Sequence, residues 1–156
     1  MSFTLHHRAL VAAPVARVWE VIVDLDRYSE WNPFVVAARS TLEVGAPISM
    51  RVRLLPFLVQ PQRETILECV PGERLCYGIA SLPGGLLRSH RCHVLRALTA
   101  ERTEYVSDFV LSGRLTPMVS GLLGGRLTDG FASNTRALAE RAEALERARV
   151  SEAGRA

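Results

Sequence analysis

The stretch TPMVSGLLGGRLTDGFASNTRALAERAEALERAR, residues 116–149, is the longest periodic segment of the chain. Its apolar residues recur at steps of three and four: Val119, Leu122, Leu123, Leu127, Phe131, Leu138, Ala142 and Leu145. This spacing predicts one long helix with a continuous apolar stripe. At 1.5 Å per residue the helix would span about 45–50 Å, which exceeds the diameter of a small domain. We therefore expect its first half to lie across the protein and the preceding chain to form its cradle.

The two ends of this helix differ in character. Thr116 can serve as N-cap, and Pro117 then occupies the first helical position, where its missing N–H costs nothing. The other end, residues 140–149, is rich in charge and is expected to project into solvent. We expect a single domain over residues 1–149 and a disordered tail over residues 150–156.

The N-terminal part of the chain predicts one strand and two short helices. Residues 2–11 alternate between apolar and polar side chains, as in a strand with one buried face. Pro14 can begin a helix that ends near Asp24. A second short helix is expected over residues 25–28, and it should stop at Trp31-Asn32-Pro33, because the residue before a proline is biased away from helical geometry.

The middle of the chain predicts further strands separated by turn residues. They are expected at 34–41, 48–54, 62–70, 73–81, 89–98 and 103–113. Short connections imply antiparallel pairing, and a sheet with one apolar face needs a cover. The expected fold is α+β: a curved, seven-stranded antiparallel sheet wrapped on the long C-terminal helix, with two short helices after the first strand.

Composition narrows the class of protein. A length of 156 residues suits one domain, and 48% hydrophobic with 22% charged residues is typical of a folded globular chain. The net charge is +3, and every basic residue is an arginine, but the arginines are scattered singly, which argues against nucleic-acid binding. The N-terminus lacks the apolar core of a secretion signal, and no segment reaches the ~18 apolar residues of a membrane span. We therefore expect a cytoplasmic protein without integral membrane association.

The cysteines and histidines do not predict a metal site. Cys69, Cys76 and Cys92 are odd in number and show no CxxC spacing, so reduced thiols are expected rather than a disulfide framework. His90 and His93 are three residues apart on an expected strand, where they face opposite sides and cannot share an ion.

Four segments carry a resemblance to a known family. They are APVARVW at 13–19, DRYSEWNPF at 26–34, LPGG at 82–85 with His90 after it, and Gly130-Phe131 with Asn134 in the last helix. From about Phe3 to about Glu146 the chain resembles the START-like, or SRPBCC, helix-grip superfamily, in the branch of polyketide cyclases, dehydratases and lipid-transport proteins. The resemblance implies a deep cavity between sheet and long helix, which holds an apolar or aromatic small molecule without a required cofactor.

Residues expected to surround this cavity come from the strands, the helix stripe and the cavity mouth. They are Trp31, Met50, Tyr77, His90, Tyr105, Ser107, Phe109, Leu123, Leu127 and Phe131. His90 is interpreted either as a hydrogen-bonding group for a ligand or as a core or rim histidine, and Trp31 either as a stacking group or as a structural plug. Similar proteins often carry Gln and Glu on the inward face of the last strand, where this chain has Ser107 and Phe109. The interior is therefore expected to be apolar.

Two functions and one interaction remain open from the sequence. The first is a binding or carrier protein for a hydrophobic molecule, whether aromatic, polyketide-like or lipid-like. The second is a polyketide cyclase or dehydratase acting in the same cavity, which would need a matched acid and base there. His90 and the tyrosines are candidates, but no inward carboxylate is evident. The third is contact with a partner or membrane surface through the apolar loop at residues 54–59.

Overall fold

The computed structural model describes residues 1–156. Its N-terminal elements are β1 (Ser2–Val11), α1 (Val15–Val23), the 3₁₀ turn η1 (Leu25–Arg27) and α2 (Tyr28–Trp31). They are followed by β2 (Val35–Arg39), β3 (Pro47–Leu55), β4 (Leu58–Val70), β5 (Arg74–Gly78), the 3₁₀ turn η2 (Pro83–Gly85), β6 (Arg88–Thr99), β7 (Arg102–Ser112) and α3 (Thr116–Ala153). No helix combines the length and the apolar composition that a membrane span requires.

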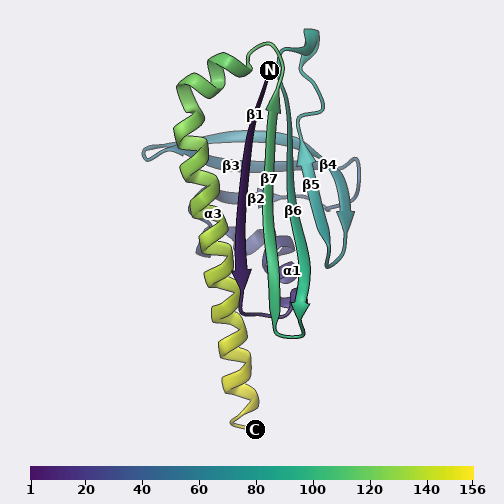
Figure 1. Ribbon diagram of the computed structural model, residues 1–156, viewed down its shortest axis with the longest axis vertical. Helices are drawn as coiled ribbons and strands as arrows, with labels where there is room; N and C mark the ends of the chain where they lie inside the picture. The colour runs from purple at the N-terminus through teal and green to yellow at the C-terminus, as the bar shows by residue number, and fades with distance from the viewer.

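All strands belong to one antiparallel sheet in the order β1-β7-β6-β5-β4-β3-β2. The sheet is strongly curved: in Figure 1, β3 and β4 cross the direction of β1, β6 and β7 at a steep angle. The long helix α3 runs lengthwise beside the sheet, and its C-terminal end extends past it (Figure 1). The expected helix-grip architecture is confirmed.

Alternation along the strands places the core between the concave face of the sheet and α3. In β7 every second residue from Thr103 to Leu111 is buried, and in β3 the buried positions are Ile48, Met50 and Val52. Successive side chains of a strand point to opposite faces, so these buried residues form one inner surface. The helix contributes Leu127, Phe131 and other residues of the predicted stripe to the same core.

The turn from α2 into β2 is held by one buried amide. The side-chain oxygen of Asn32 accepts hydrogen bonds from the backbone N–H groups of Phe34, at 3.1 Å, and Val35, at 2.9 Å. This geometry directs the ring of Phe34 toward α3, where it lies 5.1 Å from the ring of Phe131, centre to centre. A Cβ atom at Gly130 would overlap the Phe34 ring, so this helical glycine permits the close approach.

Three sequence-based boundaries are corrected. The helix α3 continues to Ala153, so residues 150–153 are helical rather than a disordered tail, since no glycine or proline occurs between Phe131 and Ala153. The helix begins at Thr116 with Leu115 at the N-cap position. The expected loop at residues 55–61 is much shorter, because β4 starts at Leu58 and residues 59–61 pair with β3.

The thiol prediction is wrong for two of the three cysteines. Cys76 and Cys92 lie directly opposite each other on β5 and β6, with their Cα atoms 4.2 Å apart, and their sulfurs are joined in a disulfide. Only Cys69 is free. The two residues are 16 positions apart in sequence. Strand register, rather than a short cysteine spacing, brings them together.

Candidate functional site

A cavity of about 310 Å³ lies between the concave face of the sheet and the first half of α3. Six of the expected lining residues border it: Met50, Tyr77, Phe109, Leu123, Leu127 and Phe131. Its other lining residues were not expected from the sequence, and they include Phe34, Val52, Leu54, Gln62, Glu64, Leu87, Ser89, Arg91 and Val119. The walls are mostly apolar, and a few polar groups lie on β4, β5 and β6.

His90 does not reach this cavity. It is exposed on the outer face of β6, with its ring nitrogens 3.8 Å from the sulfur of Cys92, whereas Ser89, Arg91 and His93 are buried on the inner face. The sequence-based parity of β6 was wrong because Cys92 and Val94 suggested an apolar inner side. The inner side is in fact the polar one, and the apolar outer side carries the disulfide.

Three other expected site residues lie away from the cavity wall. Tyr105 and Ser107 face inward and are buried, but they do not border the cavity. Trp31 is half-buried, packs edge-on against Tyr28 at 5.2 Å between ring centres, and borders a separate depression beside Arg141. Its position is that of a structural plug between the short helices and the second half of α3.

A buried hydrogen-bond network runs from the cavity wall into the core. Arg91 donates from Nη2 to the side-chain oxygen of Asn134 at 2.7 Å and from Nε to His93 Nε2 at 3.2 Å. A guanidinium can only donate, so His93 Nε2 is an acceptor and the ring proton resides on Nδ1. That nitrogen lies 2.8 Å from the hydroxyl oxygen of Tyr105 and donates to it. The hydroxyl of Tyr77 is 3.3 Å from His93 Nε2.

Arg91 is the unusual member of this network. Its side chain borders the cavity, the residue is only 4% exposed, and its guanidinium carbon lies 4.3 Å from the centre of the Phe131 ring. Its Nη1 atom is buried and has no hydrogen-bond partner. No carboxylate lies within ion-pair distance of Arg91. A buried, unpaired cation is costly, so this group favours an oxygen-bearing or anionic ligand nearby.

Glu64 overturns the expectation that the interior lacks a carboxylate. It lies on the inner face of β4, is 6% exposed and borders the cavity. Burial raises the pKa of its carboxyl group, although a hydrogen bond from Gln62 and the positive charge of Arg91 act in the opposite direction. Gln62, Glu64 and Ile66 point inward because side chains alternate along β4. Two of these three residues are polar, so the apolar pattern of the sequence did not identify this face as the inner one.

The remaining titratable groups of the network are neutral at neutral pH. Burial, with the nearby charge of Arg91, lowers the pKa of His93 well below its ordinary value. Burial raises the pKa of Tyr77 to about 12. The cavity therefore has one fixed positive charge, one carboxyl group with a raised pKa and neutral hydroxyl donors.

No preformed metal site accompanies the cavity. Cys76, His90 and Cys92 bring potential ligand atoms within 4.8 Å of one another on the outer face of the sheet. The two sulfurs are joined in the disulfide and cannot coordinate as thiolates. His93, the second histidine of that segment, faces the opposite side of β6.

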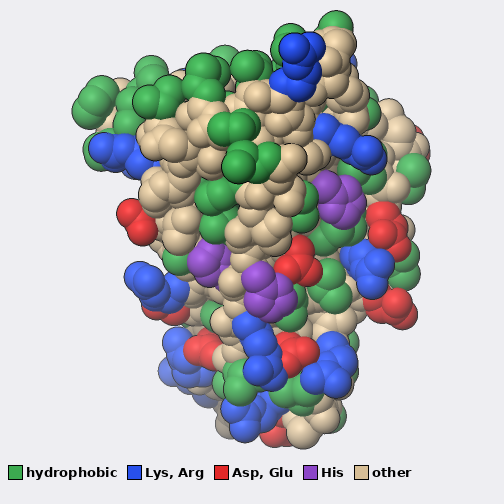
Figure 2. All heavy atoms as spheres, turned by 45° about the horizontal axis from the view of Figure 1, so that its top comes forward, with side chains coloured by type: hydrophobic (Ala, Val, Ile, Leu, Met, Phe, Trp, Pro, Cys, Tyr) green, Lys and Arg blue, Asp and Glu red, His purple; other side chains and the backbone are tan.

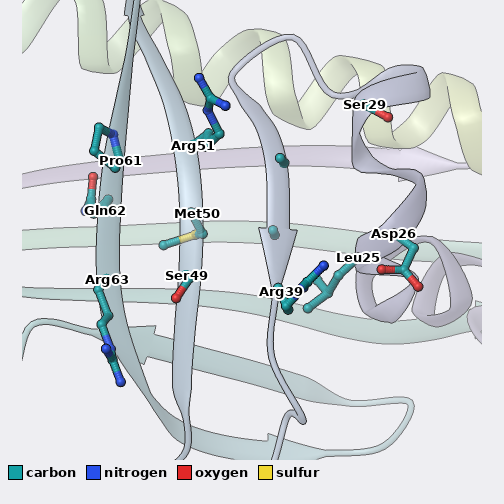
Figure 3. A pocket seen from close by; sticks show the side chains of 12 residues that line it. Leu25, Asp26, Ser29, Arg39, Ser49, Met50, Arg51, Pro61, Gln62 and Arg63 are labelled. Carbon is teal, nitrogen blue, oxygen red and sulfur yellow. The ribbon is translucent and has the colours of Figure 1, made fainter.

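A second hollow, open to solvent and of about 550 Å³, lies beside β2, β3 and β4. Figure 3 shows Arg39, Arg51 and Arg63 extending from these three neighbouring strands, with Asp26 and Ser29 across from them on the short helices. None of the three arginines forms an ion pair. This hollow is wide and basic, unlike the narrow apolar cavity.

Comparisons with known proteins agree with the fold. The family model described as polyketide cyclase / dehydrase and lipid transport matches residues 2–148. No curated protein sequence matches the chain significantly.

Solved structures give the same picture. The chain is similar to the Zhui aromatase/cyclase from Streptomyces sp. R1128, with 19% identity, coverage of 92% of this chain and 94% of that chain, and a TM-score of 0.74. It is similar to a START superfamily protein from Mycobacterium smegmatis, with 16% identity, coverage of 91% and 98%, and a TM-score of 0.68. A norcoclaurine synthase from Thalictrum flavum shares 12% identity with coverage of 91% and 94% and a TM-score of 0.67. At these identities the likeness establishes the fold alone.

Proposed function

The chain belongs to the polyketide cyclase/dehydrase and lipid-transport family, and on this premise we propose that its cavity binds a hydrophobic small molecule whose polar end contacts Arg91. The ligand class is ring-containing or acyl, with a carbonyl, enol or acidic oxygen at one end. The single observation that carries the proposal is the buried, unpartnered Nη1 of Arg91 in the wall of a mostly apolar cavity.

The shape and chemistry of the cavity support this ligand class. A volume of about 310 Å³ is at the lower end of the range for small-molecule sites. Phe34, Phe109 and Phe131 supply aromatic surface, and removing apolar ligand area from water contributes roughly 25 cal/mol per Å². Apolar burial thus supplies most of the affinity, while Arg91 orients the polar end through a charge-assisted hydrogen bond.

Two fluorescent probes with the same ring system test the proposal. Anilinonaphthalene sulfonate carries an anion, and phenylnaphthylamine does not. We expect both to bind wild-type protein, and Arg91→Gln to weaken the sulfonated probe at least tenfold while changing the neutral probe little, because a hydrogen bond to a charged group contributes about 1.5–3 kcal/mol. Leu123→Trp, at the half-buried cavity mouth, should weaken both probes. Equal affinity of the sulfonated probe for wild type and Arg91→Gln would contradict the proposal.

A cyclase or dehydratase activity is the second candidate, and Glu64 favours it. Its carboxyl group has a raised pKa and shares the cavity with Arg91 and the Tyr77 hydroxyl. Such a group can remove a proton next to a carbonyl, while Arg91 stabilises the developing enolate oxygen. The Zhui protein, of the same fold, is described as an aromatase/cyclase.

The two candidates differ in what Glu64→Gln changes. A carrier would bind probes and substrates nearly as before. An enzyme would lose turnover of a poly-β-keto thioester by roughly 10²–10⁴-fold, as when a general base is removed, with substrate affinity preserved. Product analysis by mass spectrometry, paired with a binding titration, separates the two results.

A further inference from the structure

Exposed apolar side chains surround the mouth of the cavity. Phe57 is 88% exposed and Leu58 48% exposed at the β3–β4 turn, and Leu122 is 76% exposed and Met118 53% exposed on the first turns of α3. Single exposed apolar residues are ordinary on a protein surface, whereas a group of them marks an interaction site.

The elements that carry these residues meet at one end of the protein. Leu54, Leu87, Val119 and Leu123 border the cavity, and each is close in sequence to an exposed apolar residue. The 3₁₀ turn η2 is fastened to the start of α3 by backbone hydrogen bonds from Arg114 N–H to the Gly85 oxygen and from Leu115 N–H to the Leu86 oxygen. We call the exposed set the mouth rim: Phe57, Leu58, Leu82, Leu86, Met118 and Leu122.

Charge on the same segments has one sign only. The rim residues lie within segments 44–63, 74–100 and 109–128, which contain no aspartate or glutamate. Exposed arginines without ion-pair partners lie close in sequence to rim residues: Arg53, Arg88, Arg114 and Arg126. In Figure 2 hydrophobic side chains gather over the upper part of the molecule with arginines beside them, and most carboxylates lie lower.

We propose that the mouth rim and its arginines form a docking surface for an anionic lipid bilayer, with Phe57 and Leu122 inserted among the headgroups. An aromatic or leucine side chain removed from water at the interface contributes apolar burial, and each arginine near an anionic leaflet adds electrostatic attraction. The protruding apolar side chains match the apolar region beneath the headgroups, and the unpaired arginines match the anionic headgroups. This docking would place the cavity mouth against the lipid.

The form of the rim favours a bilayer over a protein partner. Its apolar residues lie on three separate segments, the β3–β4 turn, the residues flanking η2 and the first turns of α3. A second copy of this chain would bring its own arginines against these, and like charges would oppose the contact. The docking surface lies on the outside of the protein, and docking there does not depend on what the cavity binds.

Vesicle co-sedimentation of the ligand-free full chain tests the docking surface. We expect binding to vesicles of phosphatidylcholine mixed with phosphatidylglycerol, much weaker binding to pure phosphatidylcholine, and loss of binding as salt is raised. Phe57→Ser should weaken binding to the anionic vesicles at least tenfold, since burying a phenylalanine side chain contributes about 1.5–3 kcal/mol. Arg53→Gln should weaken it about fivefold, which corresponds to about 1 kcal/mol per arginine.

Matched variants at the opposite end of the protein serve as controls. Leu10 is 50% exposed, and Arg147 is exposed without an ion pair, so Leu10→Ser and Arg147→Gln should leave vesicle binding unchanged. All variants are first compared with wild type by thermal melting. Absence of binding to anionic vesicles would overturn the proposal. So would unchanged binding of folded Phe57→Ser, or a dimer in solution that Phe57→Ser dissociates while vesicles remain unbound.

Discussion

The guanidinium carbon of Arg91 lies 4.3 Å from the centre of the Phe131 ring, so the buried cation of β6 makes a cation–π contact with an aromatic side chain of α3. The same ring stacks on Phe109 of β7 at 4.6 Å and contacts Phe34 at 5.1 Å, centre to centre. Phe131 therefore joins the helix to three parts of the sheet and its connections. It also stabilises the charge that a ligand would meet.

Replacement of Phe131 by leucine tests this role. Phe131→Leu keeps an apolar side chain but removes the cation–π contact and both aromatic contacts. We expect the free energy of unfolding to fall by about 1–3 kcal/mol, measured by urea denaturation. Phe57→Leu, at an exposed position, is the control and should change it by less than about 0.5 kcal/mol. Equal stability of the two variants would mean that Phe131 only fills space.

Sequence periodicity predicted the fold well because the buried faces of β7 and α3 are strongly apolar. Tyr105, Phe109 and Leu111 on β7, and Leu127 and Phe131 on α3, alternate or recur as their elements require. The antiparallel sheet then follows from the short connections. Hydrophobic patterning reports which face is buried wherever that face is apolar.

The same rule failed where the protein buries polar residues. On β6 the inner face carries Arg91 and His93, and on β4 it carries Glu64, so apolar patterning assigned β6 the wrong face and missed the carboxylate. These residues are buried because they hydrogen-bond one another or face the cavity, which depends on contacts between distant strands. Local sequence cannot report such contacts, and the polar part of the site was therefore the part that the sequence predicted least well.

A pair of glycine variants on α3 separates close packing from helix propensity. A Cβ at Gly130 would overlap the Phe34 ring, whereas one at Gly125 would meet open space. Gly125→Ala should therefore stabilise the protein by up to about 1 kcal/mol, the propensity difference between the two residues. Gly130→Ala should destabilise it by about 1–3 kcal/mol through overpacking, despite the same gain in propensity. Thermal unfolding of both variants provides the measurement, and a stabilised Gly130→Ala would show that Phe34 moves aside freely.

His93 makes stability depend on pH in a defined direction. Its pKa in the folded protein lies well below the ordinary value of 6.5, which the unfolded chain retains. As pH falls through about 6.5 the unfolded chain takes up a proton that the folded protein does not, so the stability decreases, by up to about 1.4 kcal/mol per pH unit. Glu64 acts oppositely, because its raised pKa lets the folded protein bind a proton before the unfolded chain does.

The contribution of His93 to the pH dependence of stability is therefore measured as the difference between wild type and a variant that lacks this histidine. The stability of wild type minus that of His93→Gln should decrease between pH 7 and pH 5, since glutamine cannot titrate. His90→Gln, on the outer face of the same strand, serves as the matched control for the effect of a histidine-to-glutamine change on β6. His90→Gln should also leave probe affinity unchanged, because that ring lies away from the cavity. A pH profile of His93→Gln identical to that of wild type would refute the buried, neutral state of His93.

The disulfide between Cys76 and Cys92 predicts both a thiol count and a stability effect. The unreduced, denatured protein should titrate as one thiol, that of Cys69. The bridge links residues 16 positions apart, and closing a loop of that size stabilises a protein by about 3 kcal/mol in the chain-entropy account. Cys76→Ser should lower the free energy of unfolding by about that amount, and Cys69→Ser, at a half-buried position, should change it much less.

Since β5 and β6 also pair through backbone hydrogen bonds, we expect Cys76→Ser to remain folded, so that the loss can be measured directly by denaturant titration. Three titrating thiols in unreduced protein, together with equal stability of Cys76→Ser and wild type, would show that the two cysteines are adjacent on the sheet but not joined.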